Sequence, residues 1–356
     1  MTAAIVLVVV ALFQGAFIVL LVMFLGVRRV VDRARRQTFE FGRYSVSAPL
    51  NAWLAGSGGV EPVVAALRAL PGASALGFTG NLARTTIPWA QRGELAAALR
   101  GEPWVQHALR GASSRRWGRR LEAARCLALV GEPSDGALLE ALLDDAYPAV
   151  AIAAVAALPR VADAQLVGMA LDRLVSLPNV VRLYLQGTLR ELRTIVGPAL
   201  ASRLLSDAPP RSLARWAELA GALEIPAALD CVPRLATHPT VRVRIAVARA
   251  LRRAPRAETV VVLQRMLLDE DHGVRAVAAR SLGELASTVA IPALLAVAHD
   301  SSWIVRYRAV LALSQLGEPG RNAVRMLRSD SDRYVAEMAT LITGLGDGAL
   351  LDMMEA

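Results

Sequence analysis

The sequence contains no lysine and few aromatic residues. All 40 basic residues of the 356-residue chain are arginine, which together with the many Ala, Gly and Pro residues suggests a GC-rich bacterial genome and does not bear on function. Only 5% of the residues are aromatic, whereas Ala and Leu abound. Ala and Leu favour helices, while β-branched and aromatic residues favour strands. We therefore predict an all-α protein.

Residue patterns typical of catalytic and metal centres are also missing. The four histidines include no H-x-x-x-H ligand pair, and the sequence has no P-loop, G-x-G-x-x-G or G-x-S-x-G motif. The two cysteines, Cys126 and Cys231, are too far apart along the chain for a disulfide in a repeat array, so we expect buried thiols. We predict no enzyme activity, no catalytic residues, no cofactor and no metal ligands.

A long uncharged segment opens the chain. Residues 2–27 carry no charged side chain, and Gln14 is the only strongly polar one. About 25 helical residues span roughly 37 Å, enough to cross the hydrocarbon core of a bilayer with some tilt. A cleaved signal peptide, the alternative, needs basic residues before a shorter apolar run, and no Arg precedes this one. We predict a transmembrane helix over residues 1–27.

A basic segment follows directly. Its arginines are Arg28, Arg29, Arg33, Arg35 and Arg36. The positive-inside rule then places the N-terminus outside and the rest of the chain in the cytoplasm, and such arginines can also contact anionic lipid headgroups. We predict a single-pass protein of the bacterial inner membrane, with a basic juxtamembrane segment and linker over residues 28–59.

The linker and the residues after it look irregular. Ala55–Gly59 is expected to be a flexible break, and residues 71–85 a loop. Two interpretations of Trp53, Phe39 and Phe41 remain open: they lie at the bilayer interface, or they pack under the first repeat.

A repeat of 31 residues runs through most of the remaining chain. Arg306 recurs as Arg275 and Arg244 at this spacing. The column seven residues further on is apolar in every copy: Leu313, Leu282, Leu251, Ala220, Leu189, Leu158 and Leu127. Self-similarity at a fixed period of 20–50 residues signals a repeat array. Each unit is predicted to be a helix, a polar turn and a second helix, and the register is clear over residues 86–346.

The best copy of the repeat carries a recognisable motif. Asp269–Leu285 reads D-x-x-x-x-V-R-x-x-A-A-x-x-L-G-x-L, which resembles the HEAT repeat in its short bacterial form and the related lyase-type repeats of phycobilisome proteins. The resemblance implies an α-solenoid, a superhelix of about eight to nine helical hairpins over residues 60–356. The copies at Ala151 and Leu213 lack the Arg and depart from the motif. HEAT-type di-iron hydroxylases use His-Glu pairs, which this sequence lacks.

The first candidate set is the structural ladder of the repeats. It comprises Arg182, Arg244, Arg275, Arg306, Leu282 and Leu313. The resemblance implies that each Arg reaches an aspartate in a neighbouring turn, such as Asp271 or Asp300, and that the leucines lie in the core. A row of arginines that binds a ligand is the alternative.

The second candidate set is a basic cluster near the start of the array. Residues 1–125 hold 16 Arg and 6 acidic residues, whereas residues 126–356 hold 24 Arg and 25 acidic residues. The positive charge is densest around Trp117, at Arg115, Arg116, Arg119 and Arg120. The cluster contacts lipid headgroups, contacts an acidic partner protein, or is a solvated helix face. Nucleic acid is not expected, because it requires a basic groove along the array.

Together these features predict a membrane-anchored cytoplasmic scaffold or adaptor. Its repeat surface would bind a protein partner that is itself associated with the membrane, for example as an accessory or regulatory subunit of a membrane enzyme or assembly. The alternative is an enzyme of the lyase-like HEAT type, or a protein that binds a pigment or another small molecule.

Overall fold

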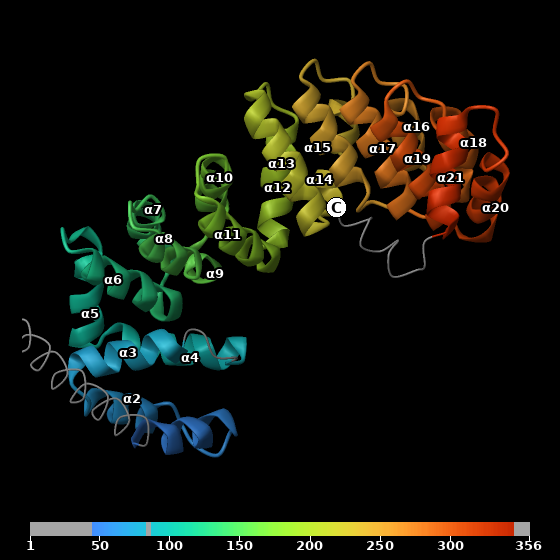
Figure 1. Cartoon of the computed structure of the whole chain (residues 1–356). Helices are drawn as coiled ribbons and strands as arrows, with labels where there is room; N and C mark the ends of the chain where they lie inside the picture. Colours follow the sequence, from blue (N-terminus) through green and yellow to red (C-terminus); the bar gives the residue numbers. More distant parts are fainter. Residues whose placement is uncertain (1–44, 83–86, 345–356) are drawn as a thin grey trace, which may run out of the picture. The chain divides into compact units, whose positions relative to one another are not determined.

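The computed structural model describes residues 45–82 and 87–344, and helices dominate them (Figure 1). No strand occurs in these two ranges. The prediction of an all-α chain is therefore confirmed for the residues described. The chain divides into two compact units, Met1–Val161 and Ala162–Ala356, which we call the N-terminal and C-terminal units.

The prediction of a transmembrane helix before the repeats is corrected. No helix within residues 45–82 and 87–344 is both long and apolar enough to cross a membrane. A span needs about 20 apolar residues, whereas the longest helices with both ends described, α6 and α13, have 14 residues each. The predicted single-pass localisation in the bacterial inner membrane loses its support as well. Residues 1–27, for which the span was predicted, lie outside the described residues.

The N-terminal unit starts with helical residues 45–54 and continues as a stack of short helices around α6. Their bounds are α2 (Glu61–Arg68), α3 (Gly72–Leu82), α4 (Trp89–Arg100), α5 (Pro103–Arg110), η1 (Gly111–Ser113), α6 (Trp117–Val130), η2 (Pro133–Asp135), α7 (Gly136–Leu143), α8 (Pro148–Val155) and α9 (Leu158–Val161). Helix α6 contacts α3, α4, α5 and α8, so it forms the centre of this unit.

Two sequence interpretations are resolved at the start of this unit. The loop predicted for residues 71–85 is wrong, because Gly72–Leu82 forms α3 and buries Ala75, Phe78 and Leu82 on one helical face. Trp53 is only 3% exposed, and its indole Nε1 donates a hydrogen bond to Glu94 Oε2 at 3.2 Å. Trp53 therefore packs against the array. Phe39 and Phe41 lie outside the described residues.

The C-terminal unit consists of paired helices. Their bounds are α10 (Ala164–Arg173), α11 (Asn179–Glu191), α12 (Arg193–Leu204), α13 (Pro210–Leu223), α14 (Pro226–Leu229), η3 (Val232–Leu235), α15 (Val241–Leu251), α16 (Ala257–Met266), α17 (His272–Glu284), η4 (Thr288–Ala290), α18 (Ile291–Val297), α19 (Trp303–Gln315), α20 (Gly317–Leu327) and α21 (Arg333–Gly344). The second helix of each pair is α11, α13, α15, α17, α19 or α21. From α11 to α19 these helices begin at residues 179, 210, 241, 272 and 303, a constant step of 31.

The pairs stack in two layers. The second helices α13, α15, α17, α19 and α21 pack one against the next and lie side by side in Figure 1. The first helices form the other layer, in which α10 contacts α12 and α12 contacts α14. Each pair covers the apolar stripe of its neighbour, which is how a solenoid builds a continuous core from short helices.

The apolar column of the repeat lies inside both units. All seven of its members are buried, and Leu282 and Leu313 are fully inaccessible to solvent. Full burial of a leucine side chain is worth about 1.5–3 kcal/mol. The column therefore supplies much of the apolar contact between successive pairs.

Glycine allows two pairs of second helices to approach closely. A Cβ atom on Gly283 of α17 would lie 2.8 Å from the Cα atom of Ala312 in α19. A Cβ atom on Gly221 of α13 would lie 2.7 Å from the Cα atom of Ala250 in α15. Both distances are shorter than van der Waals contact, so a side chain at either position would push the helices apart.

Candidate binding surface of the repeat units

An aspartate organises the turn within several pairs. Its carboxylate accepts the backbone N–H of the residue two positions later, which closes a short turn before the second helix. These bonds run from Tyr147 to Asp145 (2.9 Å), from Asp271 to Asp269 (2.9 Å), from Ser302 to Asp300 (2.8 Å) and from Asp332 to Asp330 (2.9 Å). The carboxylate is thereby fixed at the edge of the stack.

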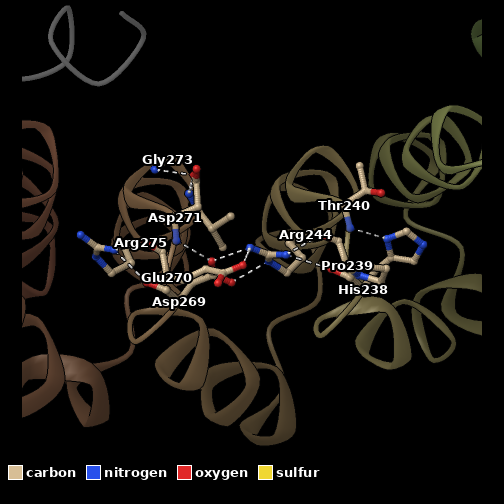
Figure 2. A network of polar contacts seen from close by, with 10 residues as sticks. His238, Pro239, Thr240, Arg244, Asp269, Glu270, Asp271, Gly273 and Arg275 are labelled. Carbon is tan, nitrogen blue, oxygen red and sulfur yellow. Dashed lines mark hydrogen bonds and ion pairs between the residues drawn. The ribbon is translucent and has the colours of Figure 1, made fainter.

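Arginines of the second helices bind these fixed carboxylates. Arg275 donates to Asp300 from Nε (2.7 Å) and Nη2 (2.9 Å), a bidentate pair. Its Nη1 donates to the carbonyls of Asp269 (2.8 Å) and Glu270 (3.0 Å) in its own turn. Arg244 does the same with Asp269, at 2.7 and 2.9 Å, and with the carbonyls of the residues before its own helix (Figure 2). Each guanidinium thus joins two successive turns.

The contacts form a chain because each aspartate takes part twice. The carboxylate of Asp269 binds Arg244, while its carbonyl accepts from Arg275 (Figure 2). Burial opposes the ionisation of Asp300, but hydrogen bonds from Arg275 and from the Ser302 backbone outweigh it and hold the pKa of Asp300 below its ordinary value. The Arg275–Asp300 pair is therefore ionic at neutral pH.

Arg120 in the N-terminal unit makes the same contacts. It pairs with Asp145, to which Nη2 donates at 3.0 Å, and Nη1 donates to the carbonyls of Ser114 (2.8 Å) and Arg115 (3.2 Å). The sequence instead predicts Arg120 as part of the basic cluster. The signal for the ladder was present, because Arg120 precedes Arg306 by six steps of 31 residues.

The contacts of Arg306 and Arg182 differ from those of the other arginines. Arg306 donates to the carbonyls of Asp300 (2.8 Å) and Ser301 (3.1 Å), but its guanidinium lies over the ring of Tyr334, 5.5 Å from the ring centroid. Arg182 binds Asn179 of its own helix. Among the described residues neither forms the bidentate aspartate pair. Asp271, one of the predicted partners, instead caps α17 by accepting from Gly273.

The predicted basic cluster is only partly described. Arg115, Arg116 and Arg119 are exposed around Trp117, whose ring stacks on Tyr147 with centroids 5.7 Å apart. The other arginines predicted to face the membrane or a partner, those of the juxtamembrane segment, lie outside the described residues: Arg28, Arg29, Arg33, Arg35 and Arg36. Nothing in residues 45–82 and 87–344 supports a contact with lipid headgroups.

A groove crosses the second helices α15, α17 and α19. Its volume is about 660 Å³, and four arginines line it: Arg249, Arg252, Arg280 and Arg308. Apolar side chains line it as well: Ile245, Val277 and Ile304. We call these seven residues the arginine groove.

The positive charge of the arginine groove is only partly balanced. Glu284 serves two of the arginines, accepting from Arg252 Nη1 at 3.0 Å and from Arg280 Nε at 3.0 Å. The carboxylate nearest to Arg249 is Glu218, at 3.8 Å, and it also binds Arg215 at 2.9 Å. Within the described residues, the four guanidinium groups therefore have, between them, ion pairs with one shared carboxylate, that of Glu284, and one more distant carboxylate, that of Glu218.

Arg308 is the least compensated of the four. It has no ion pair with another described residue, and its Nη1 is buried without a hydrogen-bond partner there. Burial and the neighbouring charge of Arg280 both lower the pKa of Arg308. An unpaired buried donor is unfavourable, so this site would gain free energy from an incoming anion.

Two of the four groove arginines follow the period of the repeat. Arg249 and Arg280 are 31 residues apart and so occupy the same column of the repeat. Neither is among the predicted site residues, which come from the columns of Arg306 and Leu313 and from the basic cluster. Arg308 shares no column with another groove arginine, and it joins them only because α17 and α19 pack together.

No cluster of three His, Cys, Asp or Glu side chains that could hold a metal ion occurs in the part of the chain that the structure describes. Cys126 and Cys231 are free thiols. Burial raises the pKa of Cys126 to about 12, which keeps this thiol protonated and unreactive near neutral pH.

Several solved structures resemble this chain at low identity. An engineered protein is 19% identical, with 91% of this chain and 95% of its own covered, at a TM-score of 0.33. Human deoxyhypusine hydroxylase in complex with glycerol is 19% identical over 75% of this chain and 98% of its own (TM-score 0.29). Kap121p is 14% identical over 86% of this chain and 43% of its own (TM-score 0.37). Similarities this weak carry no information on function.

Sequence comparison identifies the repeats directly. No curated protein matches the chain in sequence. Residues 261–342 match the family model of HEAT repeats. This stretch contains α17 and α19, the pair of Arg275 and Asp300, and the groove residues Arg280 and Arg308. The predicted HEAT resemblance is therefore confirmed for residues 261–342.

Proposed function

We propose that this protein is a scaffold that holds a partner protein on the second-helix face of its C-terminal unit. The observation that carries the proposal is the arginine groove, an open surface across three successive pairs with positive charge that the described residues leave unbalanced. HEAT solenoids mostly serve as binding surfaces. Part of the groove lies within the matched HEAT residues.

The ladder suits this function because it fixes the helices that present the groove. Arg244 and Arg275 join the turns that precede α15, α17 and α19. A binding surface loses less conformational entropy when its side chains are presented by rigid elements. The alternative of an enzyme or pigment-binding protein has weaker support, since the groove lining holds one histidine, His272, and no Cys, Asp or Glu.

Site-specific cross-linking of the full chain tests the proposal. A photoreactive amino acid replaces Val277 in the arginine groove or, as the control, Val261 on the first helix α16, which is also accessible. In extracts of the native host, a discrete partner should cross-link through position 277 and not through 261. The partner is then identified, purified and shown to bind the unmodified chain. Equal products at both positions, or none at 277, would contradict the proposal.

A further inference from the structure

We infer that the arginine groove binds a short acidic peptide segment of the partner, a run of Asp or Glu side chains in extended form. This inference rests on the proposed function and specifies its ligand. The groove joins a local excess of guanidinium groups to apolar side chains, a combination that suits a peptide.

Unpaired donors in the groove favour carboxylates. Nη1 of Arg308 and Nε of Arg252 are both buried without a hydrogen-bond partner among the described residues. A guanidinium has five N–H donors, and its planar fork matches the two oxygens of a carboxylate. Glu284 already binds two of the groove arginines, Arg252 and Arg280, so the same chemistry is present within the chain. The guanidinium of Arg308 lies over the Tyr307 ring, 5.4 Å from its centroid, and a ligand carboxylate would supply the hydrogen-bond partner that its Nη1 lacks among the described residues.

The extent of the groove sets the length of the segment. It reaches from α15 across α17 to α19. Neighbouring packed helices lie about 8–10 Å apart, so three helices span roughly 20 Å. An extended chain advances about 3.3 Å per residue, so about six residues would cross the groove. Alternate side chains of such a segment could face the arginines, and the apolar residues could contact its backbone and stems.

A nucleic acid fits these observations less well. Phosphate backbones are bound by basic surfaces that extend along the ligand. The C-terminal unit, residues 162–356, holds 23 Arg against 20 acidic residues, so its overall excess of positive charge is small. The arginine groove gathers four arginines across three helices, an extent that matches a short peptide.

Fluorescence anisotropy with the full chain tests the inference. The probe is a labelled peptide of six glutamates, and a peptide of six glutamines is the uncharged comparison. We expect the wild-type chain to bind the glutamate peptide and not the glutamine peptide. Binding should weaken as salt rises, because exposed charge pairs are screened.

Two groove variants and one matched control complete the experiment. Arg308→Gln removes a charge that has no ion pair to lose, so folding should be retained, and the affinity should fall severalfold. Arg280→Glu with Arg308→Gln should reduce it at least tenfold. Arg265→Glu, on the exposed surface of α16, reverses a charge outside the arginine groove and should change affinity less than twofold. Circular dichroism checks that each variant is folded.

Three results would overturn the inference. One is equal loss of binding in Arg308→Gln and Arg265→Glu. Another is displacement of the peptide by inorganic phosphate where chloride of equal ionic strength has no effect, which would assign a phosphate site. The third is tighter, Arg308-dependent binding of a single-stranded oligonucleotide. If a partner cross-links at position 277 but the glutamate peptide does not bind, the acidic ligand is rejected and the scaffold function is retained. Peptide binding without any cross-linked partner would reject the scaffold function.

Discussion

Replacing Arg275 by Met should destabilise the C-terminal unit by about 2–4 kcal/mol. The substitution keeps an apolar stem and removes the guanidinium that joins two turns. Four hydrogen bonds are lost, two to the Asp300 carboxylate at 2.7 and 2.9 Å and two to backbone carbonyls at 2.8 and 3.0 Å. The side chains of Arg275 and Asp300 are only 14% and 10% exposed, so water replaces few of these bonds.

The magnitude follows from the burial of the pair. Removing one partner of a fully buried ion pair costs about 3–5 kcal/mol, because the remaining charge is left without compensation. Asp300 keeps the hydrogen bond from Ser302 N–H at 2.8 Å and some contact with solvent. Both lower the penalty, which places the expected loss at about 2–4 kcal/mol.

Arg182→Met provides the matched control. Arg182 occupies the same column of the repeat, but its described partner is Asn179 in the same helix. Exposed contacts of this kind contribute about 0–1 kcal/mol, so this variant should remain close to wild type. Urea unfolding of the full chain gives the free energies, and hydrogen exchange locates the loss around α17 and α19.

A double-mutant cycle decides whether the pair itself is responsible. Arg275→Met should cost much less in an Asp300→Ala background than in the wild type, because the bidentate partner is already absent. If the two costs agree, or if Arg182→Met costs as much as Arg275→Met, the ladder does not hold successive turns together.

Four further outcomes can be measured on the same chain. Gly283→Ala should destabilise the chain by about 1–3 kcal/mol in urea unfolding, because its Cβ would lie 2.8 Å from the Ala312 backbone. The control Gly187→Ala, whose Cβ would have no neighbour within 4 Å, should be neutral or slightly stabilising. Leu282→Ala should cost about 2–5 kcal/mol and loosen hydrogen exchange in the C-terminal unit before the N-terminal one. Maleimide should label half-buried Cys231 well before Cys126, whose pKa is raised by burial to about 12. The hydrogen bond from Arg120 holds the pKa of Asp145 below its ordinary 3.8. The stability that this ion pair contributes is therefore fully present above about pH 4 and is lost as the pH falls through the lowered pKa. Asp145→Asn should remove that part of the acid-unfolding profile.

The periodic features of the fold could be predicted from sequence because stacking imposes them. Each second helix must bury the same stripe against the next, so the apolar column repeats at the spacing of the helices themselves. Helix α3 could not be predicted from this periodicity. Its Gly and Thr residues suggested a loop, and its helical state depends on tertiary burial of Ala75, Phe78 and Leu82.

The candidate sites were harder to predict because arginine serves several roles in this chain. Arg120 stands in a run of like charges that suggested a binding surface, yet its contacts are those of the ladder. The position of Arg120 in the column of Arg306 indicated its role in the ladder, whereas the local density of positive charge suggested a binding surface. Arg308 had no periodic signal at all, since its environment arises from the packing of α19 on α17.

Helix geometry separates the two roles of arginine within α17. Arg275 and Arg280 are five residues apart, and at about 100° per residue their side chains project roughly 140° apart around the helix axis. Arg275 therefore reaches the turn at the edge of the stack, while Arg280 lines the arginine groove beside Arg308. The groove residues are free to differ in charge without breaking the ladder, because neither set shares a hydrogen-bond partner with the other in the described contacts. A repeat of this kind can keep one arginine for the stack and vary the other for its ligand.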